Sequence, residues 1–143
     1  MVRDANPKMK IQVIDNSDLI VSHLTELDNE LVCSANEIQA LNSVEQLQPG
    51  LVFLNYAVCG EKTPEYIREL LNAAPATSVL VIAERLSEEN QLQCLMSGAK
   101  GFQLLEHLPQ YQLRLVAAIS NGEAWVSRIM VAKLLDRLRQ LSL

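Results

Sequence analysis

A short apolar segment near the middle of the chain, Leu51-Val52-Phe53-Leu54-Asn55-Tyr56, constrains the fold more than any other stretch. The breaker pair Pro49-Gly50 precedes it and Cys59-Gly60 follows it, so the run has the length of a strand. Its first four residues have no polar face, which predicts a strand that is covered on both sides. Asn55 is the first polar side chain after the apolar run, where the strand is expected to emerge from the sheet.

Four further segments read as strands, and amphipathic segments separate them. These strands are expected at residues 10–14, 31–35, 78–82 and 101–105. Apolar residues at helical spacing predict helices that begin near residues 17, 38, 63, 87 and 109. Five strand and helix pairs in regular alternation, joined by right-handed crossovers, predict an α/β fold with a doubly wound parallel sheet.

Capping residues mark three of these helix starts. Ser17 or Asp18 is expected to cap a helix whose apolar positions are Leu19, Ile20, Leu24 and Leu27. The hydroxyl of Thr63, followed by Pro64, is expected to cap another helix. Ser87 opens a helix with Glu88 and Glu89 in its first turn and with Leu92, Leu95 and Met96 as its expected buried residues.

The pattern changes after Gly122. Trp125-Val126-Ser127 leads into a last helix that carries more apolar residues than a surface helix usually needs, so the helix requires a partner. It either folds back on the preceding domain or serves as a linker or dimerisation helix, and we favour the second interpretation. We therefore expect a domain over residues 9–122 and a linker or dimerisation helix over residues 123–143. The interaction residues expected on this helix are Ile129, Met130, Leu134, Leu135 and Leu138.

Composition excludes several classes of protein. The chain has 143 residues, which suits one domain, and its formal net charge of −5 does not favour binding to nucleic acid or an anionic membrane. Cys33, Cys59 and Cys94 are odd in number and scattered, which argues against a disulfide framework and a zinc site. No apolar run has the length of a membrane span. We expect a cytoplasmic protein without a cofactor or a metal, and an ordinary, unreactive thiol at Cys59.

Several segments together carry a family resemblance. They are Val13-Ile14-Asp15-Asn16, Pro49-Gly50-Leu51-Val52-Phe53-Leu54-Asn55, Val79-Leu80-Val81-Ile82-Ala83, Ser97-Gly98-Ala99-Lys100-Gly101-Phe102-Gln103-Leu104-Leu105 and Asn121-Gly122-Glu123-Ala124-Trp125-Val126-Ser127. Over residues 9–122 the chain resembles the CheY-like receiver domain of two-component response regulators, and within them the NarL/FixJ (LuxR-type) transcription factors. The resemblance implies a flavodoxin-like fold with five parallel strands in the order 2-1-3-4-5 and an extra C-terminal helix.

The residues at the expected phosphorylation pocket depart from the family pattern. Receivers of this family use an acidic pair for a metal ion, an aspartate that takes the phosphoryl group, a hydroxyl, a lysine and an aromatic residue. The corresponding positions in this chain are Asp15 and Asn16, Asn55, Ala83, Leu105 and Phe102. An amide is not a carboxylate nucleophile, and one carboxylate beside an amide is a poor magnesium site. We expect Leu105 to fill the space with apolar bulk, and Asp15 to cap the next helix or stay solvated.

These departures predict an atypical receiver, or pseudo-receiver, that acts in signal transduction and transcription regulation without aspartyl phosphorylation. We expect it to act through protein-protein interaction as a homodimer and not as an enzyme. It would be the N-terminal part of a NarL-type regulator that contacts DNA only through a domain absent from this chain. Two alternatives remain open: a flavodoxin-like cofactor-binding or enzymatic domain, and a receiver that still responds to phosphate and Mg²⁺.

Overall fold

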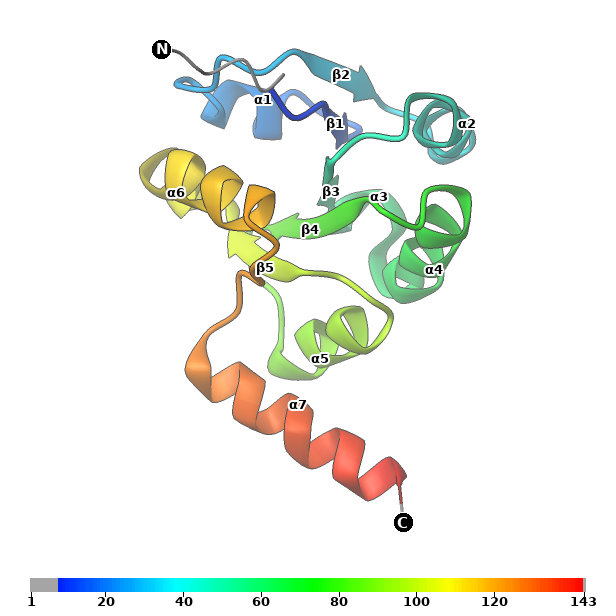
Figure 1. Ribbon diagram of the computed structural model, residues 1–143, viewed down its shortest axis with the longest axis vertical. Coiled ribbons are helices and arrows are strands. Elements are labelled where there is room, and N and C mark those ends of the chain that lie inside the picture. The colour runs from blue at the N-terminus through cyan, green and yellow to red at the C-terminus, as the bar shows by residue number, and fades with distance from the viewer. Residues whose placement is uncertain (1–7, 143) are drawn as a thin grey trace.

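The computed structural model describes residues 8–142, which form a five-stranded parallel sheet with helices on both faces (Figure 1). The strands are β1 (Ile11–Ile14), β2 (Leu31–Ser34), β3 (Leu51–Asn55), β4 (Ser78–Ala83) and β5 (Gly101–Leu104). Their order is β2-β1-β3-β4-β5, and every neighbouring pair is parallel. The expected flavodoxin-like topology is confirmed.

The helices divide between the two faces of the sheet. They are α1 (Leu19–His23), α2 (Glu37–Leu47), α3 (Tyr56–Cys59), α4 (Thr63–Ala73), α5 (Glu88–Met96), α6 (Leu108–Ser120) and α7 (Arg128–Leu141), with 3-10 turns η1 (Gly60–Lys62) and η2 (Leu105–His107). Among residues 8–142, none of these helices is both long enough and apolar enough to span a membrane.

Strand β3 explains why the sheet needs two covering layers. All five of its residues are buried, and the first four alternate between two apolar cores. Val52 and Leu54 point into the core under α2, α4 and α5, whereas Leu51 and Phe53 point into the core under α1 and α6. Figure 1 shows these two helix groups on opposite sides of the strands.

The first helix is shorter than expected. It ends at His23, so Leu24 and Leu27 are buried and half-buried, respectively, in the loop that follows it. The buried Gln112 of α6 holds this loop, because its Oε1 accepts a hydrogen bond from Glu26 N at 2.9 Å and its Nε2 donates to Thr25 Oγ1 at 3.3 Å. A partner distant in sequence therefore ends the helix, which the local apolar spacing did not indicate.

Two other expectations about helices need correction. Thr63 does not cap α4: its hydroxyl donates to Gly60 O at 2.6 Å, because α3 and η1 run directly into this helix. In α5, the expected cap is confirmed, because Ser87 Oγ accepts from Asn90 N at 3.1 Å, but the expected buried residues need correction. The buried residues of α5 are Leu92 and Cys94, while Leu95 and Met96 are half-buried.

The segment between α6 and α7 is attached to the edge of the sheet. Trp125 N donates to Lys100 O at 2.8 Å, and Phe102 N donates to Trp125 O at 3.3 Å, which extends the sheet beside β5. The indole Nε1 also donates to Gln103 Oε1 at 2.9 Å. A Cβ atom on Gly101 would lie 2.1 Å from Trp125 O, so only glycine permits this backbone approach.

We predict that Gly101→Ala detaches this segment and lowers the free energy of unfolding by about 1–3 kcal/mol, because the added methyl group meets backbone. Chemical denaturation measures the loss. Trp125 is the single tryptophan, so a red shift of its fluorescence in the folded variant reports the detachment. The matched control is Gly50→Ala, whose Cβ would meet only the flexible Met9 side chain. Equal effects of the two substitutions would contradict the prediction.

Candidate functional site

Two buried polar side chains meet where β1 and β3 end. The register pairs Ile14 with Leu54, which places the next residues of each strand, Asp15 and Asn55, side by side. They are 6% and 7% exposed, and Asn55 Nδ2 donates to Asp15 Oδ1 at 2.9 Å. This hydrogen bond joins the carboxyl ends of the two strands, at the edge of the sheet where ligands collect in folds of this kind.

The carboxylate of Asp15 is occupied by donors of its own chain. Its Oδ1 also accepts from Ser17 N at 3.2 Å and from Ser17 Oγ at 2.9 Å, and its Oδ2 accepts from Ile20 N at 3.0 Å. The expectation that Asp15 caps the following helix is confirmed. Of the two residues expected as caps, Asp18 occupies the N-cap position of α1 but its side chain forms no capping hydrogen bond, whereas Ser17 Oγ accepts from Leu19 N at 3.3 Å.

The orientation of the Asn55 amide is set by a second hydrogen bond. Its Oδ1 accepts from Ala57 N at 2.9 Å, which caps α3, so its nitrogen must face Asp15. The magnesium ion implied by receiver folds needs oxygen ligands at this place. Here the Asn55 side chain points an N–H group at the carboxylate, so these residues do not fit the ion. Residues 8–142 also contain no group of three or more His, Cys, Asp or Glu side chains that could hold a metal.

A cavity of about 310 Å³ opens beside this pair, at the ends of β3 and β4. Its lining residues are Asn16, Ser17, Leu19, Asn55, Tyr56, Ala57, Ala83, Glu84 and Arg85. Ala83 is buried and brings only a methyl group, whereas Arg85 is exposed and brings a cation. Sequence analysis missed Arg85, although its place two residues after Ala83, at the carboxyl end of β4, could have indicated it.

Two of the six expected pocket residues lie elsewhere. Leu105 is 5% exposed and packs in the core under α1 and α6, so the expectation that it fills the pocket is wrong. Phe102 is half-buried and lines a different cavity beside Trp125. The structure thus brings Asp15, Asn16, Asn55 and Ala83 together and leaves the hollow beside them open.

The surroundings of Cys59 favour its protonated thiol form. Burial, assisted by the neighbouring Glu37 carboxylate, raises its pKa to about 12. A thiol with this pKa is almost fully protonated at neutral pH, and the thiolate is the reactive form.

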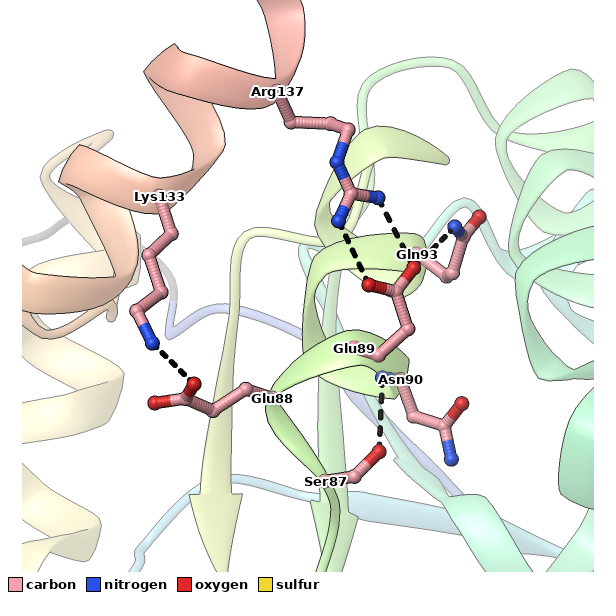
Figure 2. A network of polar contacts seen from close by, with 7 residues as sticks. All are labelled: Ser87, Glu88, Glu89, Asn90, Gln93, Lys133 and Arg137. Atoms are coloured by element: carbon pink, nitrogen blue, oxygen red, sulfur yellow. Dashed lines mark hydrogen bonds and ion pairs between the residues drawn. The ribbon is translucent and has the colours of Figure 1, made fainter.

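The last helix folds back on the domain and packs against α5 (Figure 2). Lys133 forms an ion pair with Glu88, and both terminal nitrogens of Arg137 donate to Glu89 at 2.8 and 3.0 Å. Hydrogen bonds from Arg137 hold the pKa of Glu89 at about 2, below its ordinary 4.5. The contribution of this pair is therefore complete above pH 4.5 and is lost as the pH falls toward 2.

The five expected interaction residues of α7 do not share one face. Met130 is buried and Leu134 half-buried, whereas Ile129, Leu135 and Leu138 are exposed. The alternative in which the helix folds back on the domain describes the observed position of α7, but it leaves three of these five residues exposed.

The comparisons with known proteins agree with this fold. No protein-family model matches the chain. Over 137 residues the chain is 24% identical to YhcZ of Bacillus subtilis, described as an uncharacterized transcriptional regulatory protein, with 92% of this chain and 64% of YhcZ covered. The chain thus spans less than two thirds of the length of that relative.

Solved structures of response regulators are similar in fold. A LuxR-family two-component response regulator from Aurantimonas superposes with a TM-score of 0.74 at 16% identity, covering 92% of this chain and 98% of the other. The isolated receiver domain of RcsB from Salmonella enterica, determined with BeF₃⁻, gives 0.72 at 16% identity, with 90% and 99% covered. CheY4 of Vibrio cholerae gives 0.67 at 15% identity, with 79% and 99% covered. The chain therefore has the CheY-like receiver fold.

We predict that Asn55→Asp destabilises the protein by about 1–3 kcal/mol without divalent cations, because a buried donor becomes a second carboxylate facing Asp15. Urea denaturation in the presence of EDTA measures the loss. Asn16→Asp is the matched control, since it adds the same charge at an exposed neighbouring position. An Asn55→Asp protein as stable as the control would show that the amide is not required.

Proposed function

We propose that this chain is an atypical receiver domain that acts in signal transduction and transcription regulation without aspartyl phosphorylation. The observation that carries the proposal is the hydrogen bond from Asn55 Nδ2 to Asp15 Oδ1. Two carboxylates at positions 15 and 55 would need a metal ion between them to balance their charges. Here the N–H group of Asn55 takes that place as the partner of Asp15. The site is thereby satisfied without a ligand, and no carboxylate stands at the acceptor position.

The other groups at the site support the same proposal. Phosphoryl transfer requires a nucleophilic oxygen, a cation and donors around the transferred oxygens. Ala83 offers no hydroxyl to the cavity, and Leu105 is in the apolar core rather than at the cavity. The amide groups of Ser17 and Ile20 already donate to Asp15. Little remains that would stabilise a phosphoryl group.

Signalling would then depend on association rather than on chemistry. A partner or a small ligand that binds one conformation better would shift the population, as only differential affinity does. We propose a cytoplasmic homodimer that is not an enzyme and that forms the N-terminal part of a NarL-type regulator. The similarity to YhcZ, described as an uncharacterized transcriptional regulatory protein, supports the role in transcription regulation. In this proposal DNA is contacted only through a domain outside this chain.

One observation favours a second candidate, a receiver that still responds to phosphate. The cavity beside Asn55 remains open, and the exposed Arg85 lines it together with Ser17. An anion could therefore enter next to a guanidinium group. A flavodoxin-like cofactor site has less support. The backbone N–H groups of Ser17, Leu19 and Ile20, in the loop after β1 and the start of α1, already donate to the side chains of Asp15 and Ser17, so they are not available to bind a flavin phosphate.

We predict that the protein forms no aspartyl phosphate when incubated with acetyl phosphate and Mg²⁺, as measured by intact-mass spectrometry. Mg²⁺ with beryllofluoride is also expected to leave the melting temperature and the molar mass unchanged. A receiver with a carboxylate acceptor, treated in parallel, is the positive control. A phosphoryl adduct that hydroxylamine removes would overturn the proposal. A melting shift with beryllofluoride that Arg85→Ala abolishes would favour the second candidate.

A further inference from the structure

Helix α7 is held on one side and open on the other. Its inner side carries Lys133 and Arg137, which form ion pairs with α5 (Figure 2). Met130, three residues before Lys133, is buried. In Figure 1 the helix lies at the end of the molecule, with α5 as its neighbour in the described part of the chain. The opposite side of α7 faces solvent.

The solvent side carries an apolar stripe formed by Val131, Leu135 and Leu138, which are 40%, 47% and 44% exposed. Positions three and four apart lie on one face of a helix, so these three side chains are neighbours. Leu141 is also exposed and continues the stripe. Ile38 and Leu113, by contrast, are single exposed apolar residues on α2 and α6. A contiguous stripe is more informative than such isolated residues.

The residues of the stripe, together with the half-buried Leu134 beside them, have a spacing that suits pairing with an identical helix. Val131, Leu134, Leu138 and Leu141 are separated by three, four and three residues, which is the a/d spacing of a coiled coil. The flanking e and g positions are then Met130, Leu135, Arg137 and Ser142. In a parallel pair Arg137 would face Ser142 of the other copy, so no like charges oppose each other. Met130 is buried on the inner side of α7 and would not contact the other copy.

We propose that the stripe of α7 is an interface between two copies of this chain, aimed by the ion pairs between α5 and α7. The inference rests on the homodimer of the proposed function and specifies its surface. The second copy would bring the same stripe across a twofold axis, as in a parallel two-stranded coiled coil. A seam of two heptads is short, so the receiver domains must hold the helices in place.

The ion pairs contribute in two ways. Together with the attachment of Trp125 to β5, they fix the direction of α7, which reduces the conformational entropy lost on association. Glu89 also neutralises Arg137, the one charged residue beside the seam. Because the pairs are exposed, their individual contribution is small and falls with salt.

The test is sedimentation velocity of the whole chain over a dilution series, without any phosphodonor. We expect a dimer for the unmodified protein. Leu135→Glu with Leu138→Glu is expected to raise the dissociation constant by at least about 100-fold, because two charges enter an apolar seam. The matched control is Ile38→Glu with Leu113→Glu, which adds the same charges at exposed apolar residues outside α7. Circular dichroism checks that both variants are folded.

The ion pairs are tested with Glu88→Gln and Glu89→Gln together. We expect a dissociation constant roughly three- to tenfold higher than that of the unmodified protein, and a weaker dependence on salt. Glu61→Gln with Glu65→Gln, which makes the same charge change on exposed residues elsewhere, is the control. Leu138→Cys in a Cys33→Ser background is expected to form an intermolecular disulfide, as the parallel seam requires.

Two results would overturn the inference. The first is a monomer at all concentrations, and the second is a dimer that survives the two glutamates on α7. An unchanged dissociation constant after loss of the ion pairs would reject their role in aiming the helix. A monomer at all concentrations would remove the proposed homodimer together with its interface, whereas a dimer that survives the two glutamates would remove the interface alone. Neither result bears on phosphorylation, which acetyl phosphate and beryllofluoride test separately.

Discussion

The hydrogen bond between Asn55 and Asp15 joins the two central strands and organises the loops that follow both of them. On one side, Asp15 accepts from the first turn of α1; on the other, Asn55 accepts from the first turn of α3. A carboxylate at position 55 would break this arrangement, since two buried anions repel unless a cation lies between them. The local structure of this edge therefore depends on an amide rather than on a bound ion.

The Asn55 side chain has a structural role at this site. Asn55 is not an inert filler, because both ends of its amide form hydrogen bonds. The cavity beside it is nevertheless open, and Arg85, one of its lining residues, comes from the loop after β4. The Asp15–Asn55 pair is thus fully hydrogen-bonded, while the cavity beside it stays accessible to a small ligand. Association with a partner and binding of a ligand therefore involve different parts of this domain.

At the other end of the molecule, a few contacts determine where the C-terminal helix lies. Trp125 extends the sheet beside Gly101, and two carboxylates of α5 hold two cations of α7. These contacts are mainly polar, so most of the apolar side chains of α7 remain exposed to solvent. Ion pairs and backbone hydrogen bonds attach α7 to the domain. The apolar stripe takes no part in this attachment and is free to bind a partner.

Sequence alone determined the strands, the main helices that cover them, and the absence of a carboxylate at position 55 and of a hydroxyl at position 83. The spacing of apolar residues and the type of each side chain are local properties of the chain. Sequence reasoning also gave helix capping as one of two expected roles for Asp15, the other being a solvated carboxylate. Only the tertiary structure decided that Gln112 ends α1, that Leu105 belongs to the core, that Arg85 reaches the cavity and that Glu88 and Glu89 bind α7. Each of these depends on residues far apart in the chain meeting in space, which no local pattern specifies.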